Sequence, residues 1–211
     1  LVDHAKLGGR LWLALAQVSY ADEGREIYVL PLQVAGEREA AQVAGDFPDR
    51  LLARVRTPEG EGLLYDALVD RTACATLLAA MADQRRFATG QRCELRSIAV
   101  GSFALVQGQE AASASIRQLA VEQSNTSVVV GDAYILKLFR RLETGPNPDL
   151  VIGRYLTERT GFTEIAPVAG ALSYHGQQIQ GGTVAMLQDF VANEGDGWKW
   201  FLERLRGEEV G

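Results

Sequence analysis

Short apolar runs separated by polar or glycine-containing turns dominate the first sixty residues. The runs 11–20 and 26–34, joined by a five-residue loop, predict a β-hairpin. Pro31 interrupts the second run, and because proline has no amide hydrogen it favours a sheet edge or a bulge. The small and polar residues 36–49 predict a loop, and residues 51–56 predict a short strand.

A helical period follows, in which apolar residues recur at steps of three and four and so share one helix face. These residues are Leu64, Leu68, Cys74, Leu77, Leu78 and Met81. The pattern predicts a helix over 63–86, with a break near Asp70 as an alternative, and then a strand over 92–100. The elements to this point predict a small α+β unit, an antiparallel sheet with a helix on one face.

The second half of the chain predicts three strands, a helix, two strands and a last helix. The strands are expected at 115–121, 126–130, 133–139, 171–174 and 183–191, and the helices at 148–160 and 197–206. Asn147 can cap the first of these helices with Pro148 at its first position, and Asp196 can cap the second. Gly131 and Asp132 predict a type II′ turn. We place a domain boundary after residue 90, which gives domains 1–90 and 91–211.

Composition restricts the class of protein. The 211 residues are 47% hydrophobic and 23% charged, with a formal net charge of −6, which is enough for one large or two small globular domains. The acidic balance argues against nucleic acid and against an anionic membrane as partners. No apolar run is long enough to span a bilayer and no secretory signal is present, so we expect a cytoplasmic location.

Cysteine and histidine offer little chemistry. Cys74 and Cys93 do not make a disulfide framework and are expected to be buried, reduced thiols. His4 and His175 lack companions at metal-ligand spacing, so no metal site built from this chain alone is predicted.

The most informative residue is Lys137, which lies in the middle of the apolar strand 133–139. A buried ammonium group is costly unless an anion receives its charge. In nucleotide sites of the kinase type, a strand lysine contacts the phosphates. The alternative is a lysine that extends from the strand to water.

Four segments carry a family resemblance: EQSNTS (122–127), ILKLFRR (135–141), GPNPD (145–149) and MLQDFVANEGDGW (186–198). Together they resemble the N-terminal part of bacterial maltokinases, which have an aminoglycoside-phosphotransferase-like kinase fold and sometimes occur fused to trehalose synthase. The resemblance implies an α+β protein. A small sheet-plus-helix cap domain would be followed by a protein-kinase-like N-lobe with five antiparallel strands and one main helix, and the C-lobe would be absent.

The resemblance also implies an activity. Maltokinases transfer the γ-phosphoryl of ATP to maltose, giving maltose 1-phosphate for the trehalose and glycogen branch of α-glucan metabolism. ATP and Mg²⁺ would be the cofactors, and trehalose synthase is a candidate partner. The residues that orient the acceptor and bind Mg²⁺ would follow Gly211 on the C-lobe, so this fragment alone is expected to be inactive and to hold no catalytic residue.

The resemblance assigns cofactor contacts to two segments beside Lys137. The segment before its strand would lie over the phosphates, and small side chains there let backbone N–H groups approach phosphate oxygens; an ordinary polar turn carries equal weight. The second segment would be a hinge that binds adenine through its backbone. The residues concerned are Ser124, Asn125, Thr126 and Ser127 over the phosphates, and Gln188, Asp189, Phe190 and Val191 at the hinge.

For other side chains near the expected site, an ordinary structural role is the alternative to a functional one. Val128, Val130, Ile135 and Met186 could form apolar walls for the base, but core packing is the better expectation for each one. Arg140 and Arg141 could add positive potential near the phosphates, although a solvated strand end accounts for them more simply. Trp198 and Trp200 are two residues apart, so a helix should turn one inward and expose the other as a contact for the missing lobe or the sugar.

One departure from the family pattern keeps other functions open. Kinase N-lobes pair the strand lysine with a helix acid, but the maltokinase position of that acid is Val151 here. Asp149 and Glu158 are the nearby alternatives. The chain could therefore be a non-catalytic docking module attached to trehalose synthase. A third, weaker possibility is another sugar or aminoglycoside phosphotransferase.

Overall fold

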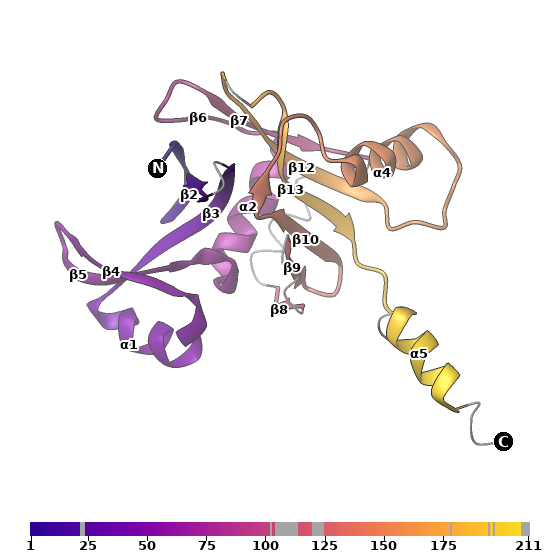
Figure 1. The fold of residues 1–211 in the computed structure, drawn as a ribbon, viewed down its shortest axis with the longest axis horizontal. Coiled ribbons are helices and arrows are strands. Elements are labelled where there is room, and N and C mark those ends of the chain that lie inside the picture. The colour runs from indigo at the N-terminus through magenta and orange to yellow at the C-terminus, as the bar shows by residue number, and fades with distance from the viewer. Residues whose placement is uncertain are drawn as a thin grey trace.

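The computed structural model describes residues 1–21, 24–101, 103, 114–119, 125–177, 179–193, 195 and 197–207. Within these residues the chain forms two antiparallel sheets and four α-helices (Figure 1). The α+β expectation is confirmed at this level.

The first sheet has the strand order β1-β2-β3-β5-β4, and β11 also pairs with β3. Its strands are β1 (Asp3–Gly8), β2 (Leu11–Ser19), β3 (Arg25–Gly36), β4 (Leu51–Thr57), β5 (Gly60–Asp66) and β11 (Arg141–Leu142). Helix α1 (Glu37–Asp46) contacts β3 and β5, and two short 3-10 turns follow at Pro48–Arg50 and Ala67–Val69.

The second sheet has the strand order β6-β7-β12-β13-β10-β9-β8. Its strands are β6 (Arg86–Ala88), β7 (Glu94–Ala99), β8 (Ile116–Gln118), β9 (Asn125–Val130), β10 (Tyr134–Phe139), β12 (Val168–His175) and β13 (Gly182–Asp189). Helix α4 (Pro148–Arg159) contacts β12, and α5 (Gly197–Gly207) follows β13. The expected five strands are therefore continued by β7 and β6 beyond β12.

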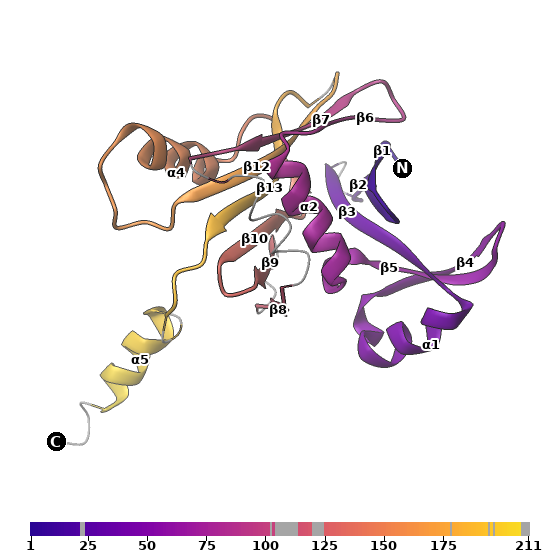
Figure 2. The ribbon, with the colours of Figure 1, turned by 180° about the vertical axis from the view of Figure 1, so that it is seen from behind.

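Helix α2 (Arg71–Ala82) lies between the two sheets and joins their cores (Figure 2). It contacts β1 of the first sheet and both β7 and β12 of the second. Seven of its twelve residues are buried: Ala73, Cys74, Ala75, Leu77, Leu78, Ala80 and Met81. Leucines of β1 and β2 and of β10 belong to the same buried cluster as this helix, so one continuous core links the sheets. The boundary placed after residue 90 stays a prediction.

Asp3 makes a polar connection between the sheets. This β1 carboxylate is 1% exposed and accepts hydrogen bonds from the hydroxyls of Thr89 (2.6 Å) and Tyr174 (2.9 Å) and from the amides of His4 and Gln91. Burial acts to raise the pKa of Asp3, but these hydrogen bonds stabilise the charged form and lower it overall. Tyr174 belongs to β12, so the carboxylate holds the two sheets together at one end.

Several expected elements are confirmed. The hairpin β2–β3, the strand β4 and the strands β9, β10, β12 and β13 lie where the sequence predicted them. Asn147 caps α4 by accepting a hydrogen bond from the Asp149 amide, with Pro148 at the first helical position. The predicted cap Asp196 lies outside the described residues.

Three local predictions are wrong. Residues 37–46 form helix α1 instead of a loop, and residues 60–66 form strand β5 instead of the first half of a helix. The alternative break near Asp70 is where the helix begins, because Asp70 caps α2 through the amides of Thr72 and Ala73. The turn after β9 has positive φ at both Gly131 (58°) and Asp132 (52°), which fits type I′ and excludes type II′.

Pro31 is not on an edge strand, because β3 has partners on both sides. On one side it lies opposite Leu13 of β2. On the other side β11 ends opposite Ile27 and Tyr28, and β5 begins opposite Leu32, which leaves a gap at Pro31. The proline therefore removes no hydrogen bond from the sheet.

Candidate functional site

Lys137 lies in the middle of β10 and is half-buried. Ser127 of β9 and Met186 of β13 are its directly opposite neighbours in the two ladders. Directly opposite residues of antiparallel strands project from the same face, so these three side chains share one face of the sheet. Leu136 and Leu138, which flank Lys137 in the strand, are fully buried on the other face, in the core shared with α2.

Helix α4 packs on the face that carries Lys137. Its Leu150 joins a buried cluster with Phe139, Val168, Ala171 and Met186. Phe139 lies two residues after Lys137, so both project toward the helix side. The order of elements therefore places a strand cation and a capped helix on the same face of the second sheet.

No carboxylate pairs with Lys137 among the residues that the structure describes. Val151, at the position where an acid was expected, is 49% exposed. Glu158 accepts a hydrogen bond from Arg154 on its own helix at 2.8 Å, and Asp149 is exposed at the helix start. Neither alternative acid therefore pairs with the lysine.

The segment assigned to the phosphates is divided by the structure. Ser124 lies outside the described residues, and Asn125, Thr126 and Ser127 are strand residues of β9 rather than a turn. Ser127 faces the same side as Lys137. Thr126 faces the opposite side, is 2% exposed and accepts a hydrogen bond from the Arg140 side chain at 2.8 Å. Its hydroxyl is thus occupied within the protein.

Asn125 lies opposite Phe139, on the face of Lys137, and lines a cavity of about 470 Å³. The cavity continues over the loop 143–147 to the start of α4. The cavity lies between β9 and the N-terminus of α4, and of the described residues expected at the phosphates only Asn125 lines it.

The expected hinge follows β13 closely. Gln188 and Asp189 are its last two residues, and Phe190 and Val191 come directly after it. The amide of Asp189 donates to the Pro167 carbonyl (2.9 Å) and that of Phe190 donates to the Ala133 carbonyl (2.8 Å). Among described atoms, the Val191 amide has no acceptor. Burial raises the pKa of Asp189, whose side chain lies on the face away from Lys137.

Core packing, the better expectation for the four apolar residues, is confirmed for Val128, Val130 and Met186, which are at most 1% exposed and lie in buried clusters. Val128 and Val130 belong to the core shared with α2, on the face away from Lys137. Ile135 and Met186 do lie on the Lys137 face, and so does Val129, which sequence reasoning missed. The alternation of side chains along β9 was the signal that could have identified Val129.

Of the two arginines that follow β10, Arg141 fits the expectation of a solvated strand end and Arg140 does not. The Arg140 side chain is 15% exposed and forms an ion pair with Asp66 at 2.5 Å. Arg141 is exposed and pairs with Glu26 and Glu143.

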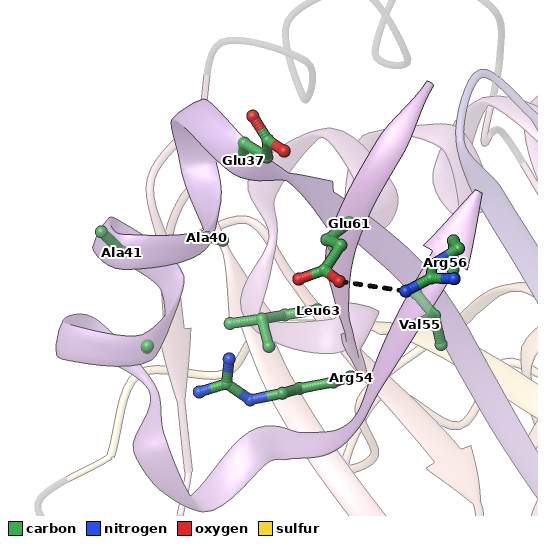
Figure 3. Close-up of a pocket in the computed structure, with 10 residues that line it drawn as sticks. Glu37, Ala40, Ala41, Arg54, Val55, Arg56, Glu61 and Leu63 are labelled. Carbon is green, nitrogen blue, oxygen red and sulfur yellow. Dashed lines mark hydrogen bonds and ion pairs between the residues drawn. The ribbon is translucent and has the colours of Figure 1, made fainter. Parts of the chain in front are cut away.

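A larger cavity, about 660 Å³, lies in the first sheet, between α1 and the β4–β5 hairpin (Figure 3). Figure 3 shows Arg54 and Leu63 beside it and the exposed ion pair between Arg56 and Glu61 at 3.5 Å. None of the residues expected to bind a cofactor lines this cavity.

The part of the chain that the structure describes holds no cluster of three acids, histidines or cysteines suited to a metal ion. It also contains no helix with the length and apolar character needed to cross a bilayer. Cys74 is buried, which raises the pKa of its thiol to about 12, and Cys93 is half-buried.

The chain is similar to glucosamine kinases. It is 27% identical over 100 residues to the glucosamine kinase of Mycolicibacterium smegmatis, a match that covers 47% of this chain and 25% of that protein. A structure titled glucosamine kinase in complex with glucosamine, ADP and inorganic phosphate matches 96% of this chain with a TM-score of 0.55 and 21% identity. A second glucosamine kinase structure, crystal form A, matches 97% with a TM-score of 0.54 and 22% identity. No family model matches.

These likenesses show that the chain has the fold of part of a sugar kinase. The kinase-like fold expected from the sequence is confirmed, whereas maltokinase specifically is not supported. The chain spans 38% of the length of the solved structures that it matches.

Proposed function

We propose that this chain is the nucleotide-binding part of a sugar kinase. The observation that carries the proposal is the placement of Lys137 on the sheet face that also holds α4, in a chain with the fold of part of glucosamine kinase. The lysine would neutralise the ATP phosphates, as a strand lysine does in kinases. In this proposal residues 1–90 are the cap domain and residues 91–211 are the N-lobe.

Some of the described residues support this assignment and others do not. Ser127 and Asn125 share the face of Lys137, and the Val191 amide has no acceptor among the described atoms. We propose contacts there and at the backbone of Ser124, Gln188, Asp189 and Phe190, while Thr126 supports the strand. The part of the chain that the structure describes holds no cluster of three acids, histidines or cysteines, and in this proposal the Mg²⁺ ligands lie on the C-lobe.

The acceptor is proposed to be an amino sugar of the glucosamine type. The sequence relative and the matched structures are glucosamine kinases, and the ligands named in one title are glucosamine, ADP and phosphate. Maltose, suggested by the sequence resemblance, is the competing acceptor.

The test is ATP-dependent phosphorylation by the complete gene product, offered glucosamine and maltose separately. We expect turnover with glucosamine, and loss of at least about 100-fold in kcat/KM for Lys137→Ala. Lys6→Ala is the matched control, since Lys6 is an exposed β1 residue. Turnover with maltose alone would refute the acceptor, and an unaffected Lys137→Ala variant would refute the role of the lysine.

The missing acid partner of Lys137 favours a second candidate, a kinase-like docking module without catalysis, with trehalose synthase as the partner suggested by the resemblance. Such a module would bind its partner equally well after Lys137→Ala. Phosphorylation of either sugar by the complete gene product would exclude this candidate.

A further inference from the structure

We propose that Arg140 is a positioning residue that fixes the start of β9 against the first sheet. The inference rests on the proposed function, because β9 carries part of the proposed nucleotide site. It adds a role for the first sheet, through one buried side chain.

Arg140 lies where the chain leaves β10 in the second sheet and enters β11 in the first. Its guanidinium donates through Nη2 to the Asp66 carboxylate at 2.5 Å and through Nε to the Thr126 hydroxyl at 2.8 Å. Its carbonyl accepts a hydrogen bond from the Val29 amide at 2.8 Å. One residue therefore joins β3 and β5 of the first sheet to β9 of the second.

The hydrogen bonds from Arg140 to Asp66 and Thr126 have a fixed geometry. Asp66 is 14% exposed at its side chain, and its other carboxylate oxygen accepts the Leu68 amide at 3.0 Å, so the carboxylate is already oriented. The planar guanidinium offers two donors in a fixed geometry. Hydrogen bonds shielded from water are electrostatically stronger than exposed ones. Thr126 is thus held in one place by a charged group anchored in the first sheet.

Holding Thr126 also determines where its neighbours project. Side chains alternate between the faces of a strand, so fixing Thr126 on one face fixes Asn125 and Ser127 on the other. That other face carries Lys137. Arg140 therefore sets, from behind the sheet, the position of the backbone that would meet the ATP phosphates.

The experiment compares variants of the complete gene product by ATP and sugar kinetics. Thr126→Val keeps the shape of the side chain but removes the acceptor, and we expect KM for ATP to rise about fivefold or more while KM for the sugar stays unchanged. Thr126→Ser keeps the hydroxyl and should retain the wild-type KM. Arg140→Lys keeps the charge near Asp66 but loses the Nε donor, so it should resemble Thr126→Val. Arg56→Gln, at an exposed residue of β4 in the first sheet, is the control.

A purely structural contact would lower the melting temperature without changing KM for ATP. An unchanged KM in both Thr126→Val and Arg140→Lys, with an active wild type, would overturn the inference alone. An equal defect in Thr126→Ser would also overturn it, because the hydroxyl would then not be the cause. A wild type that neither binds nor turns over ATP would overturn the proposed function, and with it the effect expected on KM for ATP. Amide exchange at residues 125–127 would still show whether Arg140 orders the strand.

Discussion

Helices α2 and α5 are of similar length, with twelve and eleven residues, but have opposite surroundings. α2 lies between the sheets and buries seven residues. α5 stands clear of both sheets in Figures 1 and 2, and four of its five large apolar residues, Trp198, Trp200, Phe201 and Leu205, are at least half exposed. The expectation that one tryptophan turns inward is therefore wrong among the described residues, where Trp198 is 71% and Trp200 is 52% exposed. The contrast indicates that α2 stabilises the fold, whereas α5 presents an apolar surface.

The largest expected effect tests the buried member of this pair. Leu78 of α2 is fully buried in the core that joins the sheets. Leu78→Ala should lower the free energy of unfolding by about 2–5 kcal/mol, because it removes buried surface and leaves a cavity. Urea denaturation of the chain would measure the change, and a loss below about 1 kcal/mol would show that α2 is not the shared core.

The next effect concerns the polar connection beside α2. Asp3→Asn should cost about 1.5–3 kcal/mol at pH 7, because hydrogen bonds to a charged group are lost. The pKa of Asp3 is lowered on folding, so its contribution is present above the usual value of 3.8 and is lost as the pH falls through the folded value. Denaturation between pH 7 and pH 3 should therefore show a weaker acid dependence for the variant. Asp132→Asn, in an exposed turn, is the control; equal pH profiles for Asp3→Asn and wild type would contradict the prediction.

A smaller change in stability, of opposite sign, is expected at a buried residue of β7, which packs against α2. Ser97 is 4% exposed, and its hydroxyl is the one buried side-chain polar atom without a hydrogen-bond partner in the described part of the chain. Ser97→Ala should stabilise the protein by up to about 1 kcal/mol, since it removes an unsatisfied polar group. Thermal melting would measure this. Ser173→Ala is the contrast. The Ser173 hydroxyl donates to the Arg96 carbonyl, so its removal should lower the stability of the protein.

The smallest effect belongs to α5. Leu205→Ala makes the same substitution as in α2, but at a residue that is 50% exposed, so stability should change by less than about 0.5 kcal/mol. The same urea experiment compares it directly with Leu78→Ala. A cost similar to that of Leu78→Ala would mean that the α5 side chain is buried in solution.

Sequence reasoning succeeded where local signals and final structure agree. The capped start of α4 at Asn147 and Pro148 and the hairpin at Gly131 and Asp132 depend on neighbouring residues, so they could be predicted, apart from the turn type. The strand position of Lys137 followed from its apolar neighbours.

Long-range contacts explain what the sequence did not reveal. Leu64 and Leu68 fit a helical period, but residues 60–66 pair with β3 and β4 instead. At Gly62 a Cβ atom would come within 2.7 Å of the Ala35 carbonyl oxygen, so that pairing requires a glycine there. The Asp66–Arg140 pair joins residues 74 positions apart, so no local sequence pattern could predict it. The position of Thr126 away from Lys137 depended on the β9 register, which the sequence did not specify.

The passage of the chain through Arg140 has a mechanical consequence. β10 and β11 belong to different sheets but are separated by a single residue, whose backbone and side chain are both bonded to the first sheet. A rotation of one sheet relative to the other would have to twist that peptide and break its bonds. The two sheets should therefore move together as a single rigid body.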